Sequence, residues 1–311
     1  MSSRRGYVGR GAGMTRRDWP AFLWLYLANL AIGLLATAGF ASQVGGVLNP
    51  SLESQHLARG FDVSVFFDLL LRPEVTPRVF VHGSVLAAIL FALVTLFLTP
   101  GIVQSFLSDE HLRMGPFFQA CGRWYWRFFG FEVLALLLFG FVLGVLAAVR
   151  QAVLGAAEKS PDPKTYFYVA LGTLLVMWLV AVVLRLWFDL VQFSMVHTGK
   201  FWRSIPGGLG LLCRGFFRLF WIYFSITLVG WLGLVAGLWL WMKLPPERVG
   251  LAFLVGQAIL IVWLATRYWQ RAAEALWFRE HAPALATVEA VPPAPEPIAV
   301  PPEAPASPLP V

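Results

Sequence analysis

Six apolar stretches of membrane-spanning length divide this 311-residue chain and leave little room for a soluble fold. The hydrocarbon core of a bilayer is about 30 Å thick and a helix rises about 1.5 Å per residue, so about 20 apolar residues cross it once. We expect transmembrane helices at about residues 21–40, 79–99, 128–149, 166–186, 219–241 and 250–268. The sequence therefore predicts an all-α, polytopic membrane helical bundle with six transmembrane helices.

The composition agrees with a membrane protein and explains the basic charge. Hydrophobic residues make up 58% of the chain and charged residues only 13%, whereas soluble domains carry about 25% charged residues. The net charge is +7. Because the arginines lie between the apolar stretches, we attribute this excess to membrane topology and to contact with anionic lipid head groups, and we expect no binding of nucleic acid.

The distribution of basic residues predicts the orientation. Alternate gaps, together with the two ends of the chain, hold 16 of the 24 Lys and Arg residues, and the other side holds eight. Since basic loops stay in the cytoplasm, we expect both termini there, in a bacterial inner (plasma) membrane. The first stretch also resembles an export signal, with Arg16 and Arg17 before it and Ala36-Thr37-Ala38 near its end. Its length and the five later stretches favour an uncleaved helix.

Three segments follow from the composition along the chain. Residues 1–20 are rich in Gly, Ser and Arg and predict a mobile, basic cytoplasmic leader. Residues 21–281 form the transmembrane domain. Residues 282–311 contain ten prolines and predict a disordered cytoplasmic tail with polyproline II character. In the external segment, apolar residues at helical spacing over 61–71 predict a helix on the membrane surface, with a substrate-gating element as the alternative.

The gaps on the cytoplasmic side suggest a threefold repeat of a two-helix unit. Glutamines end the second, fourth and sixth stretches, at Gln104, Gln192 and Gln270. A basic, aromatic segment that starts at Cys121 leads into the third stretch, and one that starts at Cys213 leads into the fifth. We expect these lead-ins to form cytoplasmic interfacial helices. Recurrent aromatic and Arg-rich residues at helix ends are the alternative explanation.

Two Gly-x-x-x-Gly patterns predict close helix packing. Gly140 and Gly144 lie in the third stretch, and Gly233 and Gly237 in the fifth. Small residues one turn apart let two helix backbones approach in lipid, where hydrophobic burial no longer drives association. We interpret both patterns as intramolecular packing faces, and a homo-oligomer interface is the alternative.

Ionisable residues within the apolar stretches gather near the cytoplasmic ends. Glu132, Arg185, Asp189 and Arg267 lie at similar depth, and Arg185 and Asp189 are one helical turn apart. We predict that these four residues form an ion-pair cluster that ties the third, fourth and sixth helices together. Long side chains that reach the head groups are an equally structural explanation, and a proton or ligand site is the functional alternative.

No catalytic or cofactor signature accompanies this cluster. The five histidines are scattered without metal-ligand spacing, and neither a phosphate loop nor a nucleophile elbow is present. We expect no metal, no cofactor and no enzymatic activity. Cys121 and Cys213 are expected to be small, buried and inert thiols in a reducing compartment.

Some features resemble poorly characterised bacterial six-helix membrane families, including the membrane domains associated with some glycerophosphodiester phosphodiesterases. The matching features are the sequence Trp187-Phe188-Asp189, the basic segment that ends at Arg218 and the Arg-rich end of the last stretch. The resemblance spans about residues 20–280 and carries over no catalytic residue. It implies an accessory membrane protein.

Two function classes fit these observations. The first is a non-enzymatic scaffold, assembly factor or regulator that meets lipids or a protein partner through its cytoplasmic segments or its Pro-rich tail. The second is a small transporter or channel for a solute or lipid. Ion-coupled carriers usually place carboxylates or broken helices near the middle of the bilayer. No carboxylate lies there in this sequence, so we favour the first class.

Overall fold

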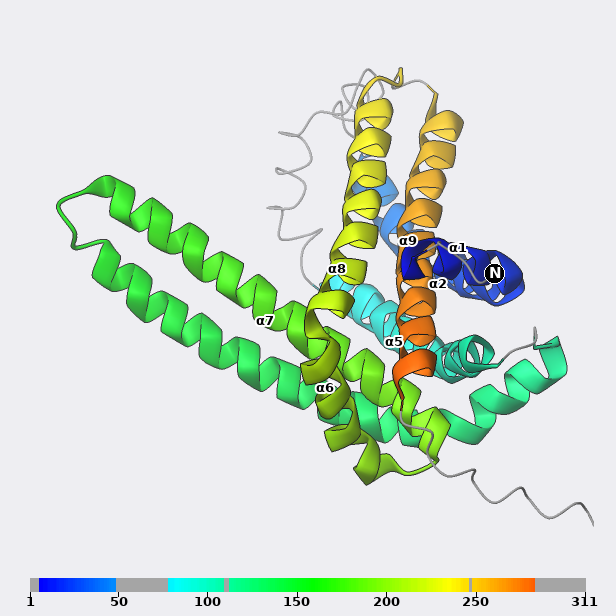
Figure 1. Ribbon diagram of the computed structural model, residues 1–311. Coiled ribbons are helices and arrows are strands. Elements are labelled where there is room, and N and C mark those ends of the chain that lie inside the picture. Colours follow the sequence, from blue (N-terminus) through cyan, green and yellow to red (C-terminus); the bar gives the residue numbers. More distant parts are fainter. Residues whose placement is uncertain (1–5, 49–77, 109–111, 246–247, 283–311) are drawn as a thin grey trace, which may run out of the picture.

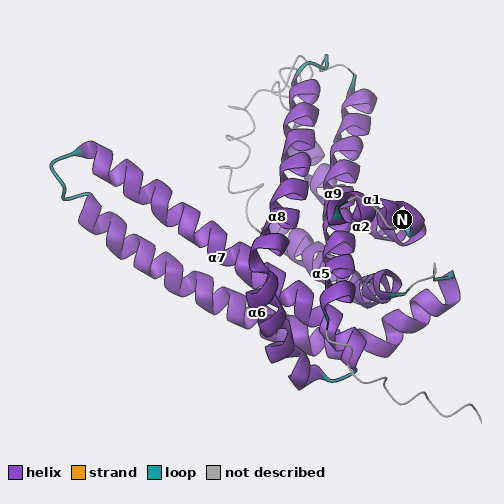
Figure 2. Ribbon diagram, viewed as in Figure 1, coloured by secondary structure: helices purple, strands orange, loops and turns teal. Residues whose placement is uncertain are grey.

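The computed structural model describes residues 6–48, 78–108, 112–245 and 248–282, and the regular elements in these ranges are α-helices (Figure 2). They are α1 (Tyr7–Arg17), α2 (Trp19–Leu48), α5 (Arg78–Leu107), α6 (Met114–Ala157), α7 (Pro163–Thr198), α8 (Phe201–Met242) and α9 (Val249–His281). Six of them, α2 and α5 to α9, are long and apolar enough to cross a membrane. The predicted helical membrane bundle is confirmed. The surface helix expected at 61–71 and the tail from 283 lie outside the described residues.

Two helices are far longer than the predicted spans. Helix α6 has 44 residues and α8 has 42, about twice the length that a bilayer core requires. The two aromatic lead-ins are helical, as expected, and each continues without a break into the span that follows it. Two helices continue through a proline: α5 contains Pro100 and α8 contains Pro206. A proline removes one backbone hydrogen bond, which neighbouring structure can tolerate.

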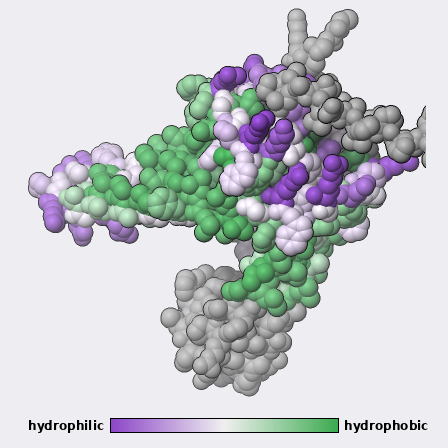
Figure 3. Space-filling view, turned by 90° about the horizontal axis from the view of Figure 1, so that it is seen from below, coloured by the Kyte–Doolittle hydropathy of each residue, from purple (hydrophilic) through white to green (hydrophobic). Residues whose placement is uncertain are grey.

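The spans form three consecutive hairpins. Helix α2 packs with α5, α6 with α7, and α8 with α9. Figure 1 shows the hairpins meeting at one end and separating at the other, where the α6–α7 arm points away from α8 and α9. Figure 3 shows the same arm as an apolar surface with hydrophilic residues at its tip and at its base. The two termini of the described chain, in α1 and α9, both belong to the end where the hairpins meet.

Most of the buried core lies where the hairpins meet, and we call this region the hub. It comprises α1, the first parts of α6 and α8, and the last parts of α5, α7 and α9, at 117–135, 204–226, 98–107, 186–196 and 266–278. Phe106, Phe128 and Trp277 are among its largest fully buried side chains. In the α6–α7 arm, by contrast, Leu136 is 71% exposed and Leu175 is 61% exposed.

One type of contact joins neighbouring hairpins in the hub. The first part of α8 lies against the last part of α7, where the indole Nε1 of Trp187 donates a hydrogen bond to the Ile205 carbonyl at 3.2 Å. One turn further on, a Cβ placed on Gly208 would lie 2.7 Å from a methyl carbon of Val191. Glycine therefore permits the close approach of these two helices.

The same arrangement recurs between α1 and α9. The indole Nε1 of Trp269 donates to the Val8 carbonyl at 2.7 Å, and a Cβ on Gly11 would lie 2.8 Å from that of Ala273. The spacing matches that between α7 and α8. Val8 and Gly11 are three residues apart, as are Ile205 and Gly208. Trp269 and Ala273 are four apart, as are Trp187 and Val191. Helix α1 thus joins the first hairpin to the third and closes the hub into a ring. The expectation of a mobile leader is wrong for residues 7–17, which form α1.

The third contact, between α5 and α6, keeps this geometry with other side chains. The rings of Phe97 and Phe118 are stacked with centroids 6.4 Å apart, and a Cβ on Gly101 would meet Cys121. Phe97, Trp187 and Trp269 therefore hold equivalent positions, one per hairpin.

This equivalence corrects the register of the suggested repeat. Cys121 corresponds to Gly208 instead of Cys213. The predicted alignment of Gln104, Gln192 and Gln270 is displaced by a few residues. Counted from the equivalent Phe97, Trp187 and Trp269, the three glutamines hold different positions along their helices. The two cysteines differ accordingly: Cys121 is buried, whereas Cys213 is exposed, contrary to our expectation.

The two Gly-x-x-x-Gly patterns have different surroundings. A Cβ on Gly233 would lie 2.7 Å from Val262 of α9, and one on Gly237 would meet Ile259. A Cβ on Gly140 or Gly144 would meet nothing within 4 Å among the described residues. The predicted packing face is therefore present on α8, whereas none of the described residues packs on the two glycines of α6.

We predict that the contact between α1 and α9 is sensitive to side-chain size at Gly11. Gly11→Leu should lower the melting temperature of the purified protein, because overpacking costs about 1–3 kcal/mol and the backbone of Ala273 is close. Gly13→Leu is the matched control, since a Cβ there meets nothing within 4 Å. Equal melting temperatures for the two variants in detergent would contradict the α1–α9 contact.

A second prediction compares the two glycine patterns. The double substitution Gly233→Leu/Gly237→Leu should separate α8 from α9 and reduce the monodisperse fraction in size-exclusion chromatography. The matched variant Gly140→Leu/Gly144→Leu should keep the wild-type profile of the monomer, because a Cβ at either position would meet none of the described residues within 4 Å. Loss of folded protein in the second variant alone would show that α6 has a packing partner.

Candidate functional site

The charged cluster lies in the hub. There the second helices of the three hairpins, α5, α7 and α9, contact one another, and we call them the descending helices. Asp189 of α7 is only 4% exposed. Its Oδ1 lies 3.5 Å from Nη2 of Arg271, on α9, and its Oδ2 lies 3.8 Å from Nε of Arg185. Arg185 also lies over the ring of Tyr223, with its guanidinium carbon 5.6 Å from the ring centroid. The cluster therefore connects α7, α8 and α9.

The structure brings three of the four predicted cluster residues together. Arg185 and Asp189 form an ion pair, and Glu132 of α6 lines the same cavity as both. Arg267 lies elsewhere: its guanidinium stacks on Trp263 at 4.7 Å and donates to Gln270 at 3.3 Å. Arg271, one turn beyond Arg267, supplies the second cation instead, because α9 turns that face toward α7.

A second buried carboxylate, Glu274, lies behind the cluster and was missed in the sequence. Glu274 is 1% exposed, and its Oε1 accepts a hydrogen bond from Nε2 of Gln270 at 2.9 Å. Its Oε2 has no hydrogen-bond partner among the described residues. The sequence signal was the spacing of four residues from Gln270 to Glu274, which places both side chains on one helix face.

Two cavities flank Glu132. The first has a volume of about 550 Å³ and lies between α6, α7 and α8, with a floor formed by Glu132, Arg185, Asp189 and Arg271. The second has a volume of about 410 Å³ and lies between α5 and α6. Glu132 and Arg271 line both cavities. The charged floor is therefore accessible from either side of α6.

The two cavities share equivalent positions on one wall but differ in the helix opposite. The first lies mainly between α6 and α7 of one hairpin, with Tyr223 from α8, whereas the second lies between α5 and α6 of neighbouring hairpins. Where the first cavity has Arg185 and Asp189, the second has Thr95 and Thr99. The Thr99 hydroxyl donates to the carbonyl of Thr95 in its own helix at 2.7 Å. The fold thus accepts neutral residues at these positions, so packing alone does not require the charges of the first cavity.

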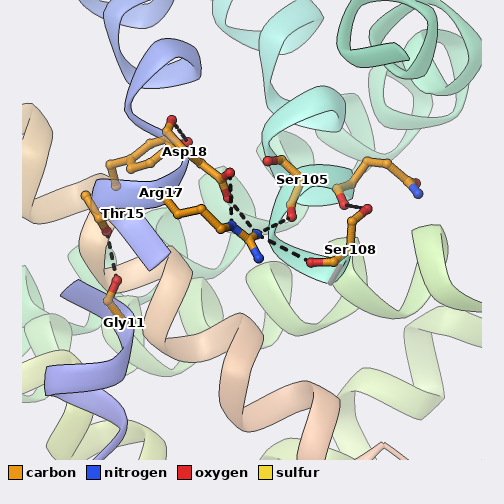
Figure 4. A network of polar contacts seen from close by, with 8 residues as sticks. Gly11, Thr15, Arg17, Asp18, Ser105 and Ser108 are labelled. Atoms are coloured by element: carbon orange, nitrogen blue, oxygen red, sulfur yellow. Dashed lines mark hydrogen bonds and ion pairs between the residues drawn. The ribbon is translucent and has the colours of Figure 1, made fainter. Parts of the chain in front are cut away.

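A separate polar network holds the junction between α1 and α2 to α5 (Figure 4). Asp18 is completely buried, and Nη2 of Arg17 donates to its Oδ2 at 2.8 Å. The same Nη2 donates to the carbonyls of Ser105 and Ser108 at 3.1 and 3.4 Å (Figure 4). These carbonyls end α5 and lack partners within the helix, so Arg17 caps that helix.

The other end of α1 is held by Glu280. Its carboxylate accepts hydrogen bonds from the Tyr7 hydroxyl at 2.5 Å and from Nη1 of Arg10 at 2.6 Å. Burial, together with the Glu280 carboxylate, raises the pKa of Tyr7 above its ordinary value. These groups stabilise the ring contact of α1 and show no arrangement suited to catalysis.

Chemically, the charged floor can bind polar groups of either sign. Guanidinium groups bind phosphate or carboxylate, and carboxylates bind ammonium groups or protons. Within the described ranges, no three His, Cys, Asp or Glu side chains are close enough to hold a metal ion.

The comparisons with known proteins add no relative. No family model, no curated protein and no solved structure matches this chain. The resemblance to six-helix membrane families therefore receives no support from them, and the function has to be argued from the site itself.

We predict that Asp189 holds the cluster together. Asp189→Asn should lower stability by about 1–3 kcal/mol, because two guanidinium groups then lose their shared counter-charge while remaining partly exposed. Thermal unfolding in detergent measures this loss. Glu132→Gln is the control from the same cavity and should have the smaller effect on melting temperature. An equal or larger loss for Glu132→Gln would place the centre of the cluster on α6.

Proposed function

We propose that this protein is a non-enzymatic scaffold, assembly or regulatory component of a bacterial plasma membrane. One observation carries the proposal: charged residues are confined to the ends of the spans. Residues 133–149, 165–184, 219–242 and 249–266 contain no Asp, Glu, Lys or Arg. Four of the six membrane-spanning helices therefore cross most of the bilayer without a charged group, whereas the hub concentrates ion pairs and caps at one end.

This distribution is less suited to coupled transport. Carriers that use ion gradients usually hold carboxylates or broken helices near the bilayer midplane. Here Asp189 and Glu274 belong to the hub, and α6 to α9 are continuous helices. A rigid hub that fixes three apolar hairpins favours a role in holding other membrane components.

The surface proposed to meet a partner is the first part of α8. Trp202 is 76% exposed and Phe217 is 85% exposed. Aromatic side chains supply large contact area and dominate the binding energy of many interfaces. With both termini in the cytoplasm, this surface and the Pro-rich tail would face cytoplasmic partners or lipid head groups.

A small transporter for a solute or lipid is the second candidate. The observation that favours it is the pair of cavities that share Glu132 and Arg271. A cavity on each side of α6 is compatible with access from two directions.

Affinity purification of the cross-linked full chain from native membranes, followed by protein and lipid mass spectrometry, distinguishes the two candidates. We expect a protein partner whose recovery falls about tenfold in Trp202→Ala/Phe217→Ala, which corresponds to about 1.4 kcal/mol. Trp231→Ala/Trp239→Ala, at exposed positions in the outer half of α8, should leave recovery unchanged. A small molecule other than a membrane phospholipid, retained at stoichiometric level without any partner that depends on α8, would overturn the scaffold proposal in favour of transport.

A further inference from the structure

Four charged residues line the cavity between α6, α7 and α8, whereas only two of them, Glu132 and Arg271, also line the cavity between α5 and α6. We propose that the first cavity binds a zwitterionic phospholipid, with the phosphate against Arg185 and Arg271 and the ammonium group against Asp189 and Glu132. The proposal goes beyond a scaffold role and does not depend on it.

The ion pairs of the floor leave binding capacity unused. Charge-assisted hydrogen bonds are normally about 2.7–2.9 Å long, whereas Asp189 lies 3.5 Å from Arg271 and 3.8 Å from Arg185. The buried Oδ2 of Asp189 accepts no hydrogen bond among the described residues. The two guanidinium groups retain side-chain exposure of 33% and 27%. Donors and acceptors therefore remain open toward the cavity.

The signs of these charges select a head group that carries both. Two guanidinium groups and two carboxylates line the floor. A purely anionic ligand would meet the carboxylates at close range without compensation, and a simple cation would meet the guanidinium groups. A phosphate joined to a primary ammonium satisfies both, and its N–H groups supply donors for Asp189.

The walls above the floor suit an acyl chain. Leu136, Phe139 and Trp178 line the cavity beside the charged residues. Beyond them the apolar faces of the arm continue, with Leu174 57% exposed and Leu175 61% exposed. The α6–α7 arm separates from α8 and α9 in this direction (Figure 1), so a chain that starts at the floor can run along apolar surface into the bilayer.

The cavity between α5 and α6 provides the internal comparison. It shares Glu132 and Arg271 with the first cavity but has Thr95 and Thr99 at the helix positions that Arg185 and Asp189 hold in α7. It therefore lacks one guanidinium group and one carboxylate of the proposed site. The specificity for a zwitterionic head group should therefore belong to the first cavity.

The test measures lipids that stay bound to the full chain. The protein is reconstituted into nanodiscs with equal amounts of phosphatidylethanolamine, phosphatidylcholine and phosphatidylglycerol, extracted in mild detergent and examined by native mass spectrometry. We expect one retained phosphatidylethanolamine, favoured over phosphatidylcholine, whose quaternary ammonium has no N–H donor. Preferential retention of phosphatidylglycerol, or equal retention of all three, would overturn the proposal.

Three variants locate the site. Ala181→Phe fills the proposed lipid cavity and should abolish retention, whereas Ala92→Phe fills the cavity between α5 and α6 and should preserve it. Arg185→Thr installs the residue found at Thr95 and leaves Asp189 paired with Arg271, so the protein should fold. It should weaken retention about tenfold, as expected for loss of one charged contact. Unchanged retention in both Ala181→Phe and Arg185→Thr, with wild-type melting temperatures, would overturn the assignment.

Discussion

The close approach of one helix start to the end of a neighbouring helix is the contact on which this structure depends. Lipid is as apolar as the helix surfaces, so burial of apolar area cannot drive helices together in the bilayer, and tight packing has to do so. Gly11, Gly208 and Gly101 provide that packing, one at each junction between hairpins. Because α1 closes the third junction, the three hairpins form a ring and none of them depends on a single neighbour.

The charged cluster follows from this ring. Thr99, Asp189 and Arg271 hold equivalent positions on the three descending helices, which touch one another in the hub. A position that is repeated around a centre places three side chains near one another, so opposite charges on two of them can pair. In this protein Asp189 pairs with Arg271, and the threonine of the first hairpin bonds to its own helix. The repeat thus places charged residues at these positions on α7 and α9 and a neutral threonine at the same position on α5.

The sequence predicted the helices better than their lengths or partners. Apolar run length and the positions of Arg residues were sufficient to place six spans. The long helices α6 and α8 exceeded the prediction because their aromatic and basic lead-ins are helical and continuous with the spans that follow them. The pairing of Arg185 with Asp189 was accessible because the two residues lie one turn apart on the same helix. Arg267 and Arg271 are also one turn apart, and only the rotation of α9 against α7 selects the second.

The sequence by itself determined that the chain is a helical membrane protein, because continuous runs of about 20 apolar residues match the length of a spanning helix, which makes every backbone hydrogen bond within its own segment. It also determined that the polar groups gather at one end of the helices. The tertiary structure alone decided which residues are equivalent, which glycines pack and which charges meet. Those properties depend on contacts between residues far apart in the chain, such as Gly11 with Ala273, and local sequence patterns carry no information on how one helix is rotated against another.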